Sequence, residues 1–167
     1  LVRYTDLLDL YKEHKKKGFN REEYLYEASQ IPGMYVPSLY DVTYNDDGTI
    51  KEIKPNREGV PKKVKKEVVE DFDAVDYPTK PLVSYMQVTQ DRCVLEIPRG
   101  CIRGCRFCQA GSVYKPLREK NIETLKKQAI EMLDSTGQGE ISLASLSSSD
   151  YSQLKELVDF LIEECRL

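Results

Sequence analysis

The chain has 167 residues and a formal net charge of −3, with 40% hydrophobic and 32% charged residues. This composition is typical of a globular protein of one or two small domains, and it excludes collagen-like, low-complexity and wholly disordered chains. The sequence lacks an apolar run near the roughly 18 residues that span a bilayer, and it lacks a secretory leader. We therefore expect a cytoplasmic protein without a membrane partner, and the missing initiator methionine predicts a piece of a longer chain.

Two helices are predicted at the N-terminus. Apolar residues at helical spacing predict a helix over residues 4–17, which ends at Gly18. Asn20 and Glu23 have the spacing of a capping box, which predicts the start of a second, short helix. His14 lies on the first helix, where we expect a solvated side chain.

An irregular α+β segment is predicted over residues 1–81. Alternating apolar residues on both sides of an Asn-Asp-Asp-Gly turn predict a β-hairpin over residues 39–55. Residues 62–69 indicate another extended segment, with solvated lysines. Residues 77–81 contain two prolines, which disfavour helix in the residues before them, and so predict an extended linker.

A regular alternation of strands and helices is predicted over residues 82–167. A strand is expected at residues 92–97, followed by a helix that Asn121 caps and that stops near Gly137. A second strand is expected at residues 141–146. This alternation implies an α/β fold with parallel strands and right-handed helical crossovers.

The last helix is predicted from a capping box and an apolar stripe. Asp150 and Gln153 form the capping-box pair, after a turn at residues 147–149. The stripe that would face the core consists of Leu154, Leu157, Val158, Leu161, Ile162 and Cys165.

Three of the five cysteines crowd into one short loop. Cys101, Cys105 and Cys108 are separated by three residues and then by two, and the odd total without a leader fits a reducing compartment. Metal binding or redox chemistry is therefore a better explanation than a disulfide framework. Cysteine thiolates hold iron–sulfur clusters, and a short loop can bind three corners of a cubane cluster and leave the fourth iron open.

The neighbouring residues suit such a cluster. Gly100 and Gly104 permit unusual backbone conformations and the approach of main-chain N–H groups to the sulfurs. Arg99, Arg103 and Arg106 would offset the negative charge of a thiolate-bound cluster. The loop also follows the carboxyl end of a strand, where parallel α/β folds place their sites.

Other interpretations remain open for this loop. A structural zinc ion would need a fourth ligand, which Cys93 could supply, although Cys93 and Cys165 both fall on apolar stripes typical of a core. A local disulfide is another alternative. The arginines could instead bind RNA phosphates in an accessory domain, although nucleic acid is disfavoured by the acidic net charge and by the lack of an aromatic platform. Glu96 precedes the loop, where it could orient an arginine or a substrate, or form a structural ion pair.

The cysteine spacing, with Phe107 directly before the last cysteine, resembles the signature of radical S-adenosylmethionine (SAM) enzymes. Residues 99–118, together with residues 31–40 upstream, resemble a narrower group within that superfamily. These are Fe–S oxidoreductases that carry an N-terminal cobalamin-type domain ahead of a radical SAM core. The resemblance extends over most of the chain and is looser before residue 81.

The resemblance implies both a fold and a chemistry. The fold would be a partial (βα)6 barrel, of which this chain holds the first two strand–helix units. Cys101, Cys105 and Cys108 would bind three irons of a [4Fe–4S] cluster, the fourth iron would chelate SAM, and the main chain of Phe107 would lie near the adenine. With an electron from an external donor such as ferredoxin or flavodoxin, the complete enzyme would cleave SAM to a 5′-deoxyadenosyl radical that acts on an unknown substrate. The fragment alone is expected to be inactive.

Two departures from the family pattern stand out. Many members have a Gly-Gly-Glu run after the second strand that contacts SAM, whereas this chain has Ser147, Ser148, Ser149 and Asp150 there. Ser147, Ser149 and Asp150 are therefore candidate SAM contacts, although capping the last helix is the role we favour for Asp150. The Asp-x-His-x-x-Gly motif of cobalamin domains is absent around His14, so cobalamin would be used only through a domain outside this chain.

Two strands cannot close a barrel, so the sheet is expected to leave an open edge. A strand edge with unpaired N–H and C=O groups invites pairing with another chain. We therefore expect the fragment to self-associate. The alternative is that the hairpin at residues 39–55 folds back over the sheet.

Overall fold

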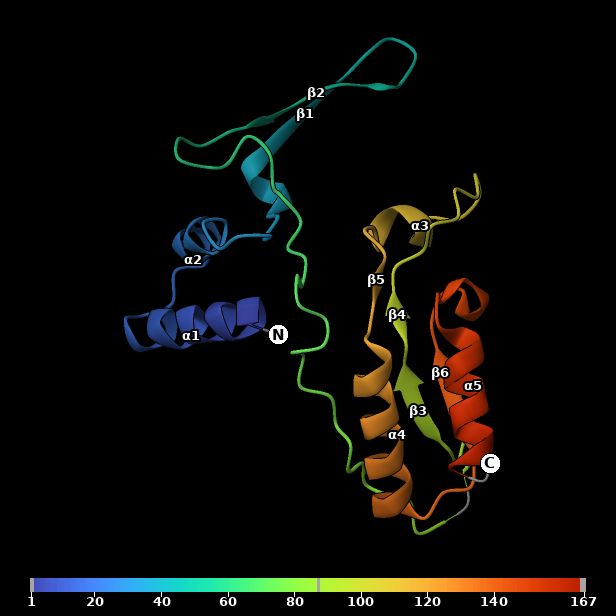
Figure 1. The fold of residues 1–167 in the computed structure, drawn as a ribbon. Coiled ribbons are helices and arrows are strands. Elements are labelled where there is room, and N and C mark those ends of the chain that lie inside the picture. The colour runs from blue at the N-terminus through green and yellow to red at the C-terminus, as the bar shows by residue number, and fades with distance from the viewer. Residues whose placement is uncertain (1, 87, 166–167) are drawn as a thin grey trace. The chain divides into compact units, whose positions relative to one another are not determined.

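The computed structural model describes residues 2–86 and 88–165 (Figure 1). The chain consists of two compact units, Leu1–Val69 and Glu70–Leu167. The division comes earlier than the boundary predicted at residue 81. Phe72 and Tyr77 belong to the second unit, since their rings lie 5.0 and 4.3 Å from the ammonium of Lys120.

The first unit begins with two helices, as predicted. Helix α1 (Val2–Lys16) is followed by Gly18, whose φ of 84° is left-handed, and helix α2 (Arg21–Ala28) follows at once. The side-chain oxygen of Asn20 accepts hydrogen bonds from the backbone N–H groups of Glu22 (3.0 Å) and Glu23 (3.4 Å). The predicted cap is therefore confirmed.

The expectation of a solvated His14 is wrong. The side chain is buried between α1 and α2, its Nε2 lies 3.1 Å from the Glu27 carboxylate, and its ring meets the ring of Tyr24 edge-on. The physical reason is helical spacing. His14 follows Leu10 by four residues and Tyr11 by three, so it continues the face that packs on α2.

The predicted hairpin is present. After a short 3-10 turn, η1 (Pro37–Leu39), strands β1 (Tyr40–Tyr44) and β2 (Ile50–Pro55) pair antiparallel. Residues 62–69, which are expected to be extended, form neither a helix nor a strand. Their apolar residues are few and are half-buried or exposed, so a strand would gain little packing there.

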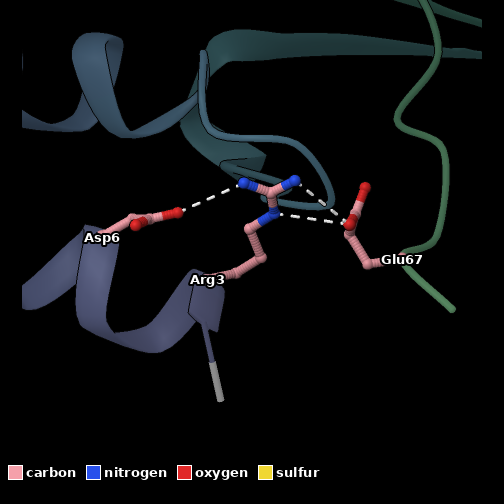
Figure 2. Close-up of polar contacts among 3 residues, drawn as sticks. All are labelled: Arg3, Asp6 and Glu67. Atoms are coloured by element: carbon pink, nitrogen blue, oxygen red, sulfur yellow. Dashed lines mark hydrogen bonds and ion pairs between the residues drawn. The ribbon is translucent and has the colours of Figure 1, made fainter. Parts of the chain in front are cut away.

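Residues 62–69 contact the start of α1 instead (Figure 2). The Arg3 guanidinium lies 3.3 Å from the carboxylates of both Asp6 and Glu67. Gly33 has a φ of 83°, and a Cβ built there would lie 2.8 Å from Cγ of Glu67. Because these charges are exposed, the ion pairs add little stability, and the close approach at Gly33 does more to define the path of the chain.

The second unit has the predicted α/β alternation, with additional short elements. Its elements are β3 (Cys93–Glu96), β4 (Pro98–Arg99), α3 (Ala110–Val113), β5 (Arg118–Glu119), α4 (Ile122–Thr136), β6 (Ile141–Ala144), the 3-10 turn η2 (Ser148–Asp150) and α5 (Leu154–Glu163). Strands β3 and β6 are parallel, from Cys93 opposite Ile141 to Glu96 opposite Ala144. Strands β4 and β5 form a short antiparallel pair that the sequence does not predict.

Helices α4 and α5 cover one face of the β3–β6 sheet (Figure 1). Cys93, Leu95 and Ile97 point into this core, whereas Val94 and Glu96 lie on the opposite face, as strand alternation predicts. The core residues from the helices are Ile122, Leu125, Ala129, Met132, Leu157 and Leu161. One face of the sheet is therefore covered by helices, and the other remains accessible.

Both predicted ends of α4 are confirmed. Asn121 accepts a hydrogen bond from the backbone N–H of Glu123 at 2.8 Å, and Gly137 is left-handed with a φ of 69°. The buried Lys120 precedes this cap. Its Nζ lies 3.2 Å from the Gln128 side-chain oxygen and over the rings of Phe72 and Tyr77, and burial lowers the pKa of Lys120.

The predicted capping role of Asp150 is wrong. Asp150 closes η2, and α5 begins at Leu154 with no side-chain cap from Gln153. Instead, the Glu119 carboxylate accepts hydrogen bonds from the backbone N–H of Ser152 at 2.9 Å and from its hydroxyl. A carboxylate from β5 thus binds the chain just before the helix, an arrangement that no local pattern could predict.

The predicted stripe on α5 is only partly correct. Leu157 and Leu161 are buried, but Ile162 is 57% exposed. Leu154 and Cys165 pack at the margin of the core. Within the described residues, no helix is both long and apolar enough to cross a membrane.

Candidate functional site

The cysteine loop runs between β4 and α3, beyond the carboxyl end of β3 (Figure 1). It begins at Gly100, whose φ is 108°. A Cβ there would lie 2.7 Å from the carbonyl oxygens of Tyr114 and Pro116, so the position accepts no side chain without a shift of the backbone. Gly104 has open space around it and no left-handed φ, so the structure gives no comparable reason for a glycine there.

The loop thiols are accessible. Cys105 and Cys108 are exposed and Cys101 is half-buried, with its sulfur 3.4 Å from the backbone N–H of Arg103. Cys93 lies in the core, where its sulfur is 3.3 Å from the Thr136 hydroxyl. The predicted core position of Cys93 is therefore confirmed, and its orientation counts against a four-cysteine zinc site.

The donor set suits an iron–sulfur cluster, because thiolates on an open, irregular loop can wrap around one. Over residues 2–86 and 88–165, no group of three His, Cys, Asp or Glu side chains is placed to hold a metal ion.

A polar hollow of about 470 Å³ lies beside the thiols. Its lining includes Cys105, Cys108, Phe107, Gly111 and Ser112, together with the cationic residues Arg103, Arg106 and Lys115. Such a positive, thiol-lined cavity suits an anionic ligand. The Phe107 side chain, at 93% exposed, takes no part in any core.

The turn after β6 contacts the cysteine loop through one ion pair. The Arg103 guanidinium donates two hydrogen bonds to the Asp150 carboxylate, from Nε at 2.9 Å and from Nη2. Hydrogen bonds from Arg103, and then from the Ser147 hydroxyl, lower the pKa of Asp150. Of the predicted site residues on this turn, Asp150 contacts the loop, Ser147 hydrogen-bonds Asp150, and Ser149 is exposed.

A second hollow, of about 430 Å³, opens at the carboxyl ends of β3 and β6. It is lined by Tyr77, Glu96, Pro98, Arg99, Gly100, Tyr114, Ala144, Ser145 and Leu146. The Arg99 guanidinium binds the Glu96 carboxylate through Nε at 2.9 Å and Nη2 at 2.7 Å, and this hydrogen bonding raises the pKa of Arg99. Glu96 therefore orients an arginine, one of the roles that the sequence suggested.

Sequence reasoning missed the two tyrosines of this second hollow. Tyr77 was expected in a linker, yet its hydroxyl donates a 2.6 Å hydrogen bond to the carbonyl of Val94 in β3. Tyr114 follows the short helix α3. Neither belongs to a periodic apolar pattern, so the local sequence carries no signal for them.

Comparison with known proteins identifies one partial relative. Over 86 residues, or 52% of this chain, the sequence is 35% identical to "Uncharacterized protein MJ0966" of Methanocaldococcus jannaschii. The aligned segment covers 19% of that protein, so the chain matches about a fifth of its length. No family model and no solved structure matches the chain.

Proposed function

We propose that this chain binds a [4Fe–4S] cluster through Cys101, Cys105 and Cys108 and forms the start of a radical SAM core. The observation that carries the proposal is the placement of three accessible thiols on a cation-lined loop at the carboxyl end of a parallel strand pair. The accessible face of the sheet supports it, because the helices of a (βα)6 barrel cover the outside of the sheet and leave its inner face free for a site.

The residues of the two hollows have distinct roles in this proposal. The three thiolates hold the cluster, and Arg106 contributes positive charge beside them. The second hollow, with the Glu96–Arg99 pair and Ser145, receives SAM or the substrate at the end of the sheet. When bound, the cluster would pass one electron to SAM, whose sulfonium would cleave to methionine and a 5′-deoxyadenosyl radical.

The reaction also needs components from outside this chain. The electron comes from an external donor such as ferredoxin or flavodoxin. Cobalamin, if the complete enzyme uses it, is held by another domain. The substrate is selected by later parts of a longer protein.

Anaerobic reconstitution tests the proposal directly. The wild-type chain should bind about four irons and four sulfides and develop the visible absorption of a thiolate-bound cluster. Replacing Cys101, Cys105 or Cys108 by alanine should abolish this, because each removes one ligand, whereas C93A should retain it. If C93A also loses the metal, or if the wild type holds one zinc ion and no iron, the proposal is wrong.

SAM binding tests the second part of the proposal. Adding SAM to the reduced cluster of a longer protein that contains this segment should change its EPR spectrum, since SAM would chelate the open iron. An unchanged spectrum at saturating SAM would mean that the cluster does not bind SAM. The chain would then belong to an iron–sulfur protein outside the radical SAM enzymes.

A further inference from the structure

We propose that the Arg103–Asp150 ion pair is a latch that holds the cysteine loop on the β6–α5 turn and so positions Cys101 and Cys105. Asp150 is then a positioning residue that acts through Arg103. Asp150 does not cap the last helix, and its position is explained without a direct contact to SAM. The consequence for metal binding rests on the proposed function, whereas the latch itself does not.

Arg103 and Asp150 form a bidentate ion pair. Both carboxylate oxygens of Asp150 accept from one guanidinium, across 47 positions of sequence. The Asp150 side chain is only 9% exposed, while that of Arg103 is 62% exposed. The turn therefore provides a fixed acceptor, and the loop reaches toward it.

The acceptor is held in place by its own turn. The backbone N–H of Asp150 donates to the carbonyl of Ser147 at 3.2 Å, and the Ser147 side chain hydrogen-bonds the carboxylate. The Ser145 and Ser148 hydroxyls lie 2.9 Å apart and tie the turn to the end of β6. The serines of this turn thus support a carboxylate that binds the cysteine loop.

The donor lies at the centre of the loop. Arg103 is two residues from both Cys101 and Cys105, and its backbone N–H donates to the Cys101 sulfur. Its carbonyl oxygen would lie 3.1 Å from a Cβ built on Gly111, so the loop also rests closely on α3. Fixing Arg103 therefore fixes the segment that joins two of the three thiols.

The pairing also changes how charge is distributed in the hollow. Asp150 neutralises the Arg103 guanidinium, so Arg103 serves as an anchor. Arg99 is likewise paired with Glu96, so two of the three arginines expected to offset cluster charge are already bound to carboxylates.

Metal-free protein provides the test of the latch. In D150N, which keeps the shape of the side chain and loses its charge, iodoacetamide should alkylate Cys101 about threefold faster than in the wild type, and trypsin should cut after Arg106 faster by a similar factor. D159N, which breaks the exposed Lys155–Asp159 pair on α5, is the matched control and should change neither rate. Cys93 is an internal reference for global unfolding.

Charge reversal tests whether the pair itself is responsible. R103D alone should behave like D150N, and the double variant R103D/D150R should restore slow alkylation of Cys101. Rates in D150N equal to those of the wild type, or a double variant no slower than the single ones, would overturn the latch. Iron binding by the wild type separates the two proposals: a wild type that binds no iron refutes the proposed function and leaves the latch result standing.

Discussion

Gly100 is the point at which the cysteine loop is forced close to another part of the chain. We expect G100A to lower the free energy of unfolding by about 1–3 kcal/mol, because the methyl group meets two carbonyl oxygens and the left-handed φ is strained for alanine. G104A in the same loop is the matched control and should be nearly neutral, since nothing lies within 4 Å of a Cβ built at Gly104. Urea unfolding followed by circular dichroism measures both, and equal losses would contradict the explanation.

Tyr151 should make the stability of the second unit depend on pH in the alkaline range. Its side chain is buried, its hydroxyl donates to the carbonyl of Lys120 at 3.0 Å, and burial raises the pKa of Tyr151 to about 12. An unfolded tyrosine titrates near pH 10, so the unfolded chain loses this proton first. The stabilisation is therefore present below about pH 10 and is lost as the pH rises toward 12.

The measurement is the urea midpoint between pH 9 and pH 11.5. We expect the midpoint of the wild type to fall over this range more steeply than that of Y151F, which cannot ionise at this position. Y151F should be less stable than the wild type below about pH 10, because it loses the hydrogen bond to the carbonyl of Lys120, and this difference should shrink as the pH rises. Parallel pH profiles for the two proteins would rule out Tyr151 as the titrating group.

Residues whose role depends on their immediate neighbours could be predicted from the sequence. Asn20, Asn121 and Gly137 all have the roles that helix-end rules assign to them. Asp150 and His14 do not, since Asp150 binds Arg103 from a distant loop and His14 packs on a second helix. A role was predicted correctly where the residue's partners are close in the sequence, and wrongly where its partner lies in another element.

Helix α5 offers a comparison between two apolar residues of one predicted stripe. L157A should lower the free energy of unfolding by about 2–5 kcal/mol, because it leaves a cavity at a fully buried position. I162A should cost less than about 1 kcal/mol, since that side chain is 57% exposed. Thermal or urea unfolding distinguishes them, and similar losses would mean that Ile162 is covered in solution.

Long periodic segments were predictable as elements, and short ones were not. The hairpin, α4, and the parallel pair of β3 and β6 all rest on patterns of several residues. Strands β4 and β5 contain two residues each, too few for any period, and they form only because the chain doubles back after the cysteine loop. The candidate site was predictable to the same extent: the thiols are visible in the sequence, but their surroundings come from pairings across many residues.

The two-stranded β3–β6 sheet should cause the chain to self-associate, because its edges can pair with another copy. Among the described residues this sheet has two strands, and Leu146 beyond β6 is exposed. The outer edge of β3 is partly covered, because Tyr77 hydrogen-bonds the carbonyl of Val94 there. We therefore expect copies of the chain to pair along the other edge, β6. Light scattering should give a mass that rises with concentration.

A charge near this edge should weaken the association. L146K should lower the mass at a given concentration, while I130K, at a similarly exposed position on α4, should not. A monomer at all concentrations would show that the edge is already covered. Equal effects of the two variants would place the contact elsewhere.

The aromatic surroundings of Lys120 determine where the second unit can be excised. A shortened version that starts at residue 82 would lose both rings over the ammonium, and also the Asp73 carboxylate that accepts from the backbone N–H of Asn121 at 2.8 Å. It would leave the buried amine hydrogen-bonded to Gln128 but without the rings that cover it. A piece that begins at Glu70, the first residue of the second unit, keeps all of these contacts, so the apparent linker is the first structural element of the domain that follows it.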